Sequence, residues 1–187
     1  PEQLEVTPQE RRHDASQRRK VAEMSPAEMR HALLLDDLTG LPNRRAYEES
    51  QKKAVQVFMD MDSLKYMNDT FGHDSGDKIL RAFGEVLRTA AGNDAFHLSG
   101  DEFIIQSDSV EAADAIMQAA NETAAAVTLE FQAPDGKRIN LTGLGFSYGY
   151  GEPYDGKDGP AYRLAEIQAA NNKTERENLG LRAKRGE

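Results

Sequence analysis

The sequence has no cysteine, and no apolar stretch among its 187 residues approaches the length of a membrane span or of a signal-peptide core. Without thiols the chain can form neither disulfides nor thiolate zinc sites. A membrane-spanning helix needs about 20 consecutive, mostly apolar residues, and a signal peptide also needs a continuous apolar core. We therefore expect a cytoplasmic segment without a membrane partner.

Basic residues are also in short supply, because 23 Lys and Arg stand against 32 Asp and Glu, for a formal net charge of −9. At long range such a chain repels polyanions, so the composition argues against a general nucleic-acid-binding surface. We expect no nucleic-acid partner. An anionic nucleotide would have to be received locally, through a metal ion and backbone amides.

The hydrophobic content of 39% in 187 residues is enough for one core and predicts one domain with appended segments. Residues 1–31 are expected to form a charged linker and a helix that leads into the domain, since Ser25-Pro26-Ala27-Glu28 has the form of a helix cap followed by proline. Residues 32–178 would form the domain and residues 179–187 a charged tail. A chain that does not start with methionine is expected to be a piece of a longer protein.

Hydrophobic periodicity and turn residues predict the order of helices and strands. We expect a short helix at 44–54, a strand at 55–60, a helix at 74–91, a hairpin with strands at 95–98 and 103–106, a helix at 110–126, a second hairpin with strands at 128–132 and 139–150, and a last helix at 161–178. This β-α-β-β-α-β order predicts an α+β fold of the ferredoxin-like type. Such a fold has a central antiparallel sheet with helices on one side, here with an added β-hairpin.

Two of the predicted strand ends carry carboxylates. Asp60 ends the apolar run that starts at Val55, and Asp101 lies in the turn Ser99-Gly100-Asp101-Glu102 of the first hairpin. The turn alone is weak support, because Gly-Asp is ordinary hairpin chemistry. Two acidic strand ends side by side in one sheet would make an oxygen-ligand site for Mg²⁺, which prefers carboxylates, waters and substrate phosphates. The alternative is a pair of ordinary exposed acids at strand ends.

Four blocks of the sequence resemble, in order and spacing, the signature blocks of the GGDEF domain, the diguanylate cyclase family. They are Asp36–Arg45, Asp60–Asp69, Phe71–Asp77 and Ser99–Phe103, the last being an SGDEF variant of the signature. The resemblance implies the fold of nucleotide cyclases and polymerase palms, and the condensation of two GTP into cyclic di-GMP and pyrophosphate by a transient homodimer. It also implies an upstream sensory or regulatory module in the full-length protein.

The resemblance also implies the metal-binding and catalytic residues. Asp60, Asp101 and the backbone carbonyl of Met61 would hold the Mg²⁺ or Mn²⁺ ions that bridge the nucleotide phosphates. Attack on an α-phosphate needs charge neutralisation and a lowered pKa of the attacking hydroxyl, and a two-metal site provides both. Glu102 would lie near the ribose hydroxyl, with an exposed turn glutamate as the alternative. Lys65 joins Asp101 and Glu102 as a catalytic residue.

Nucleotide-binding residues follow from the same resemblance. Asn68 and Asp77 would read guanine, and the backbone N–H groups of Ser63, Leu64 and Lys65 would wrap the β- and γ-phosphates. The guanine-reading pair has local alternatives. Asn68 could instead form an Asx turn, and Asp77 could decorate the first turn of a helix, where the helix dipole favours an acid.

The chain departs from the family pattern at several positions. Ser99 replaces the first glycine of the signature, and His97 stands where an arginine is common. The segment 88–94 has no arginine at the position that the family's Arg-x-x-Asp product-inhibition motif needs, whether the motif ends on Asn93 or on Asp94, so we expect this inhibitory site to be missing. The last helix keeps Lys173 at a phosphate-binding position but has Glu177 where a basic residue is expected. An alternative function is therefore a catalytically weak or inactive GGDEF domain that binds GTP or a protein partner as a regulatory module.

Two further assignments are structural. Asp36 and either Arg44 or Arg45 resemble the family's pair at the start of the domain, in which the acid fixes the linker helix. Gly72 and Gly76 are expected to serve a turn rather than chemistry.

Overall fold

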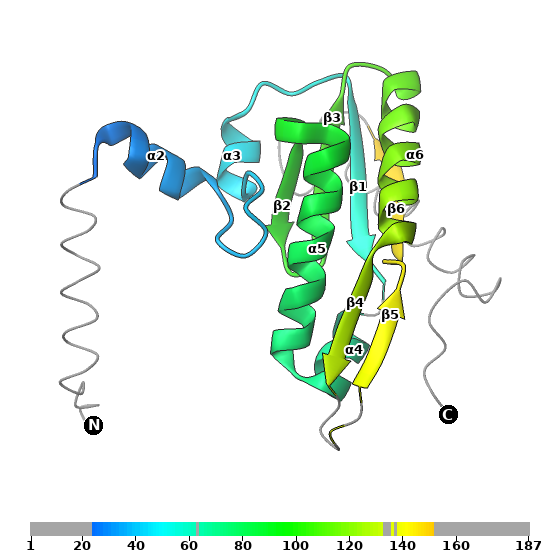
Figure 1. The fold of residues 1–187 in the computed structure, drawn as a ribbon. Helices are drawn as coiled ribbons and strands as arrows, with labels where there is room; N and C mark the ends of the chain where they lie inside the picture. Colours follow the sequence, from blue (N-terminus) through cyan, green and yellow to red (C-terminus); the bar gives the residue numbers. More distant parts are fainter. Residues whose placement is uncertain (1–23, 63, 133–135, 137, 152–187) are drawn as a thin grey trace, which may run out of the picture. The chain divides into compact units, whose positions relative to one another are not determined.

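The computed structural model describes residues 24–62, 64–132, 136 and 138–151 (Figure 1). The predicted last helix and charged tail, with Lys173, lie outside the described residues, and so does Ser63. The chain divides into two compact units, Pro1–Leu35 and Asp36–Glu187. In the part that the structure describes, no helix has the length and apolar character needed to cross a bilayer.

Helix α2 (Pro26–Leu34) is the described helix of the first unit. Its start is a capping box, because the Glu28 N–H donates to the Ser25 hydroxyl (3.3 Å) while the Ser25 N–H donates to the Glu28 carboxylate (2.8 Å). The helix start at Pro26 therefore agrees with the sequence-based prediction.

The second unit contains α3 (Arg44–Glu49), β1 (Val55–Met61), α4 (Leu64–Phe71), α5 (His73–Ala91), the 3-10 turn η1 (Gly92–Asp94), β2 (Ala95–Ser99), β3 (Glu102–Ser107), α6 (Val110–Ala126), β4 (Thr128–Gln132), β5 (Arg138–Thr142) and β6 (Phe146–Gly151). Four strands form one sheet in the order β2-β3-β1-β6, and each neighbouring pair is antiparallel. Strands β4 and β5 form a separate antiparallel hairpin. This arrangement confirms the predicted α+β fold with an added hairpin.

Apolar side chains alternate between the two faces of the sheet, as expected from the two-residue period of a strand. Figure 1 shows α5 and α6 lying across one face. The core beneath them includes Val57, Met59, Phe103 and Ile105 from the strands and Phe83 from α5. The Phe83 ring packs against the Phe103 ring at a centroid distance of 5.0 Å. Burying each such side chain stabilises the fold by about 1.5–3 kcal/mol.

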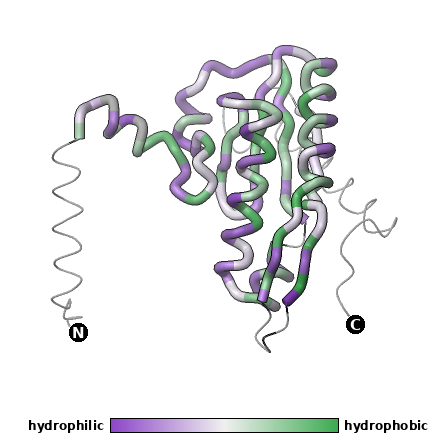
Figure 2. The backbone as a smooth tube through the Cα atoms, in the orientation of Figure 1, coloured by the Kyte–Doolittle hydropathy of each residue, from purple (hydrophilic) through white to green (hydrophobic). Residues whose placement is uncertain are grey.

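The other face of the sheet carries a smaller apolar cluster of Tyr47, Phe58, Phe96, Leu98 and Ile104. Helix α3 contributes Tyr47, whose ring meets that of Phe96 edge-on at 5.4 Å. In Figure 2 the central strands are mostly apolar, whereas the helices alternate between apolar and polar residues along their length. Such alternation is the pattern of helices with one buried face.

The segment 139–150, predicted as one strand, is two strands in the structure. Gly143 adopts a positive φ of +80°. Its N–H donates to the Val127 carbonyl (2.8 Å), and the Leu144 N–H donates to the Ala124 carbonyl (3.0 Å). These bonds hold the turn between β5 and β6 against the C-terminal end of α6. Strand β5 therefore pairs with β4, and β6 pairs with β1 in the main sheet.

Two helices also differ from the prediction. Helix α3 ends at Glu49 rather than at residue 54, because Ser50 is extended and bonds to the Tyr47 carbonyl through its N–H (3.2 Å) and hydroxyl (2.7 Å). Helix α4 was not predicted. Its buried residues, Leu64 and Met67, have the three-residue spacing of an amphipathic helix.

Candidate active site

The two predicted acidic strand ends lie at the same end of the sheet. Asp60 near the end of β1 is the direct cross-strand partner of Glu102 at the start of β3. The Met61 N–H donates to the Asp101 carbonyl (3.0 Å), which ties the hairpin turn to the end of β1. All three carboxylate-bearing residues are partly exposed. The structure therefore brings the two acidic strand ends together, as the sequence predicted, and the role of Asp60, Met61 and Asp101 as metal ligands stays a prediction.

The signature turn, residues 99–102, connects β2 to β3. Gly100 has a φ of +53°, a conformation that L side chains rarely adopt, so a glycine is needed here. The Ser99 hydroxyl donates to Glu102 Oε2 (2.9 Å). Arg44 Nη2 of α3 lies 3.6 Å from the same oxygen. The serine that departs from the family pattern thus contacts the signature glutamate directly.

Helix α4 begins three residues after the end of β1. Leu64 in its first turn is buried, whereas the Lys65 side chain is exposed. The first N–H groups of an α-helix have no partner within the helix and carry a partial positive charge, which suits them to anions. The start of α4 therefore places backbone donors near the acidic end of the sheet.

Asn68 of α4 packs closely against the first turn of α5. A Cβ atom added at Gly76 would lie 2.0 Å from Asn68 Oδ1, which is far closer than real Cβ contacts. Gly76 therefore serves this close approach, and the prediction that it serves a turn is wrong. Gly72, with a φ of +86° before α5, does serve one. Sequence reasoning missed the role of Gly76, because the contact joins two separate helices.

The Asn68 side chain leaves a buried acceptor at this contact. Its Oδ1 atom is buried and has no hydrogen-bond partner within the described part of the chain. Asp77 follows Gly76 in α5, and its carboxylate lies 3.7 Å from Arg81 Nη2 in an exposed ion pair. Exposed pairs of this kind are weak, at about 0–1 kcal/mol, so Asp77 can exchange its partner for a ligand. The predicted base-reading residues thus stand on adjoining helices.

The donor set at the end of the sheet consists of oxygen atoms. Among the described residues there is no group of three or more His, Cys, Asp or Glu side chains arranged to hold a metal ion. Asp60 and Asp101 would contribute two carboxylates to a metal site here, and Met61 would contribute a carbonyl. Mg²⁺ is typically bound by one or two carboxylates together with waters and substrate phosphates, so these residues fit such an ion.

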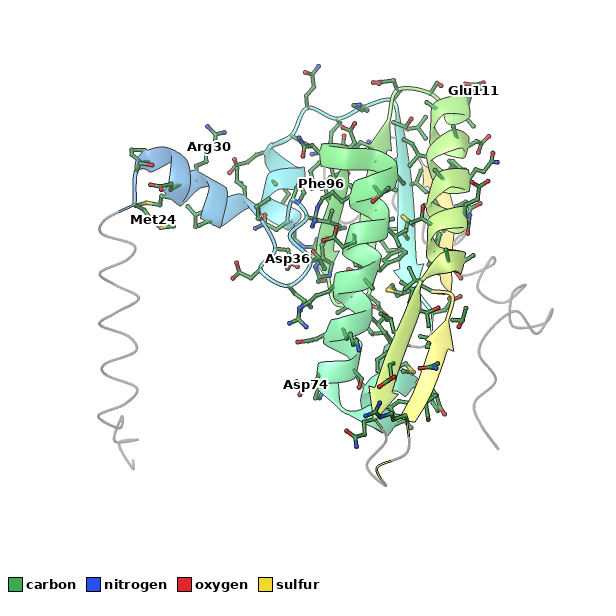
Figure 3. All side chains as sticks on the ribbon, in the orientation of Figure 1. Met24, Arg30, Asp36, Asp74, Phe96 and Glu111 are labelled. Carbon is green, nitrogen blue, oxygen red and sulfur yellow. The ribbon has the colours of Figure 1, made fainter. Side chains whose placement is uncertain are left out.

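Asp36, labelled in Figure 3, lies in the turn before α3 and bonds to the hairpin strand rather than to an arginine. Its Oδ1 atom accepts from the N–H and the hydroxyl of Thr39, both at 2.8 Å, and lies 3.0 Å from His97 Nδ1. Arg44 and Arg45 pair with glutamates instead. The expected pairing of Asp36 with one of these arginines is therefore wrong. Burial would raise the pKa of Asp36, but the bonds from Thr39 and His97 hold that pKa below its ordinary value.

The charged residues of segment 88–94, where the family carries its product-inhibition motif, form ion pairs within the chain. Arg88 pairs with Glu85 at 2.7 Å, and Asp94 pairs with Lys53 at 2.9 Å. The absence of the product-inhibition site stays a prediction.

Comparison with known proteins adds the following. The family model described as "Diguanylate cyclase, GGDEF domain" matches residues 33–178. Diguanylate cyclase DgcS of Shewanella oneidensis is 37% identical over 95 residues, which cover 44% of this chain and 32% of DgcS. Diguanylate cyclase DgcN of Escherichia coli is 30% identical over 136 residues, which cover 66% of this chain and 33% of DgcN. The matched regions thus span about a third of the length of these curated relatives.

Among solved structures, the diguanylate cyclase SiaD of Pseudomonas aeruginosa, in complex with its activator SiaC, has a TM-score of 0.64. Its sequence is 24% identical, and the match covers 89% of this chain and 72% of SiaD. At this level of identity the likeness shows that the two chains share a fold.

Proposed function

We propose, because this chain belongs to the GGDEF family of diguanylate cyclases, that it condenses two GTP into cyclic di-GMP and pyrophosphate. The observation that carries the proposal is the meeting of two acidic strand ends, recorded by the 3.0 Å hydrogen bond from the Met61 N–H to the Asp101 carbonyl. The oxygen atoms near this contact would serve as metal ligands beside the start of α4. In the proposed reaction each ribose 3′-hydroxyl attacks the α-phosphorus of the other GTP, and pyrophosphate leaves.

Asp60, Asp101 and the carbonyl of Met61 would hold Mg²⁺ or Mn²⁺. When bound, such ions neutralise charge on the phosphates and lower the pKa of the attacking hydroxyl. We assign Glu102 to the attacking ribose hydroxyl. The hydrogen bond from Ser99 and the nearby Arg44 support this assignment, because they restrict the orientation of the Glu102 carboxylate.

The triphosphate would be received at the start of α4. Backbone N–H groups of residues 63–65 would bind the β- and γ-phosphates, as the free donors of a helix N-terminus can do. The exposed side chain of Lys65 can reach the same phosphates. Lys173 would add a second cation. This local set of donors offsets the unfavourable net charge of −9 for a polyanionic substrate.

Guanine would be read by Asp77 and Asn68. A carboxylate accepts a pair of hydrogen bonds from the adjacent N1–H and amino groups of guanine, whereas adenine presents an unprotonated N1 there. Asn68 stands on the adjoining helix, and its amide, which can both donate and accept, would read the remaining edge of guanine.

The product requires two phosphodiester bonds between two nucleotides. One site of this kind binds one GTP, so we propose a transient homodimer in which each subunit presents its GTP to the other. The specific rate should then rise with protein concentration. A specific rate that stays constant over a hundredfold dilution would contradict the two-subunit mechanism.

The decisive experiment incubates the chain with GTP and Mg²⁺ and identifies the products by mass spectrometry, with EDTA and ATP reactions as controls. We expect cyclic di-GMP and pyrophosphate from GTP when the metal is present. If the chain binds GTP but forms no product, the alternative of a GTP-binding regulatory module is favoured. The observation that favours this alternative is the hydrogen bond from Ser99, a residue that departs from the family pattern, to the signature glutamate Glu102.

A further inference from the structure

His97 is buried in β2, two residues before the signature turn, with 6% of its surface exposed. Its ring stacks on that of Phe103 at a centroid distance of 4.5 Å and an interplanar angle of 20°. A buried polar ring needs hydrogen-bond partners, because an unsatisfied one is costly. Nδ1 lies 3.0 Å from Asp36 Oδ1, and Nε2 lies 3.0 Å from the Gly100 carbonyl oxygen.

The two partners of the His97 ring are both acceptors. The Gly100 carbonyl oxygen cannot donate, so Nε2 donates in the hydrogen bond to it. The 3.0 Å contact of Nδ1 with Asp36 Oδ1 does not have hydrogen-bond geometry and is a close polar contact with the carboxylate. His97 thus connects two turns that are far apart in the sequence.

The backbone around His97 supports the same connection. The His97 N–H donates to the Pro42 carbonyl (2.9 Å), and His97 forms an isolated bridge with Asn43. On the other side, the pairing of β2 with β3 shifts register between His97 and Ser99. The strand ladder is therefore irregular where the chain enters the signature turn, and the ring contact with Gly100 supplies a constraint at that point.

We propose that His97 is a positioning residue for the metal-binding turn, because it ties the Gly100 carbonyl, and with it the adjoining Asp101, to Asp36. This inference rests on the proposed function of Asp101 as a metal ligand. The Gly100 carbonyl belongs to the peptide group that leads directly into Asp101, so holding this carbonyl limits the movement of the ligand. Loss of a partner that orients a metal ligand typically costs about 10- to 100-fold in metal affinity or activity.

Two amide variants separate the two contacts of the ring. The side-chain nitrogen of His97→Asn lies near the position of Nδ1 and can keep the contact with Asp36. The longer His97→Gln places its nitrogen near Nε2 and can keep the bond to Gly100. Both variants lose the aromatic stacking and one of the two ring contacts, so they form a matched pair.

The test measures Mn²⁺ binding to the full chain by electron paramagnetic resonance of the free ion, with a non-hydrolysable GTP analogue present. Thermal unfolding is measured on the same samples. We expect His97→Asn to weaken Mn²⁺ binding about tenfold or more, and His97→Gln to weaken it by less than about threefold at a similar loss of thermal stability. Equal Mn²⁺ affinity in the two variants would overturn the inference and leave His97 a purely structural residue.

Nitrogen-15 NMR of the wild-type His97 ring gives a measurement that does not depend on whether a variant folds. We expect the Nε2–H resonance to shift when Mg²⁺ and the GTP analogue bind, and an unchanged resonance would contradict the proposal. The proposed function can fail separately. A chain that binds Mn²⁺ in the expected pattern but forms no cyclic di-GMP retains the positioning role, whereas a wild-type chain that binds no Mn²⁺ contradicts both.

Discussion

At the end of the sheet opposite the candidate site, Lys53 lies between two carboxylates, with its Nζ atom 2.9 Å from Asp94 and 3.3 Å from Asp108. At the site end, the end of β1 and the hairpin turn bring Asp60 and Asp101 together. In both regions an acid follows or ends a strand. The far end holds a lysine of the chain between its acids, and we assign the equivalent space at the site end to a metal ion.

The comparison teaches how a strand-end carboxylate should be interpreted. Asp108 directly follows β3 and Asp60 is the second-last residue of β1, so the local sequence alone does not distinguish the two roles. What separates them is the three-dimensional context. The bond to Asp94 is the main cause of the raised pKa of Lys53, which identifies the far end as an ordinary ion-pair network.

The largest expected effect comes from exchanging one acid at each end. Asp101→Asn should lower cyclic di-GMP formation by at least about 100-fold, as expected for removing a preorganised charge from a transition state. Asp108→Asn, which makes the same chemical change at the far end, should keep nearly full activity. The measurement is the initial rate of product formation, with circular dichroism to verify the fold. Full activity in a folded Asp101→Asn variant would remove Asp101 from the metal site.

A second comparison lies within the first turns of α5. Asp77→Asn and Asp77→Ser should reduce the preference for GTP over ATP, which we expect to be roughly 100-fold or more in kcat/KM, because the site loses its paired acceptor. Asp74→Asn is the matched control, since Asp74 is an exposed acid in the first turn of the same helix, three residues before Asp77 (Figure 3). Direct competition between GTP and ATP measures the preference. If the Asp77 and Asp74 variants behave alike, Asp77 serves only the helix terminus.

Gly76→Ala should raise the KM for GTP by about tenfold while kcat changes less. The added Cβ would lie 2.0 Å from Asn68 Oδ1, so the amide must move away from the base-reading position, and small displacements in a site cost large factors. Gly84→Ala is a contrasting variant, because the atom it adds meets Thr39 at 2.8 Å rather than a residue of the proposed site. That variant should lower thermal stability and leave the KM for GTP nearly unchanged. A normal KM in folded Gly76→Ala would show that the Asn68 contact is not part of nucleotide binding.

The sequence was sufficient to predict the sheet and the acidic strand ends, because alternating apolar residues and turn signals are local. The break between β5 and β6 was missed because its cause is distant. Gly143 bonds to Val127, and β6 then pairs with β1, and neither contact leaves a pattern within the segment 139–150. Helix α4 could have been found from the spacing of its buried residues.

The contact between Asp36 and His97 was beyond sequence reasoning for a similar reason. Each residue has an ordinary local environment, and the pair exists only because β2 packs beside the turn that precedes α3. The guanine-reading and metal-binding roles came from the resemblance to the family. The structure adds which of these residues lie on neighbouring strands and helices.

The smallest expected effect is on stability at the two extremes of pH. Asp36 has a pKa held below its ordinary value of 3.8, so it stabilises the folded state above that value, and this contribution is lost as the pH falls through the lowered pKa. Lys53 has a pKa raised above its ordinary value of 10.5, so its contribution is present below that value and is lost as the pH rises through the raised pKa. The stabilisation from the Asp36 contacts is thus lost in acid, and the stabilisation from the ion pairs of Lys53 is lost in alkali.

Two variants test this difference by urea unfolding across the pH range. Asp36→Asn should be less stable than the wild type at neutral pH, and the gap should narrow below about pH 4 as the wild-type carboxylate is protonated. Lys53→Gln should show a gap of only about 0–1 kcal/mol at neutral pH, because its partners are exposed, and this gap should narrow above about pH 10. If the Asp36→Asn gap stays constant down to pH 3, the carboxylate contributes no charge to its bonds with Thr39 and His97. In that case the ion pairs of Lys53 would contribute more electrostatic stabilisation than the contacts of Asp36.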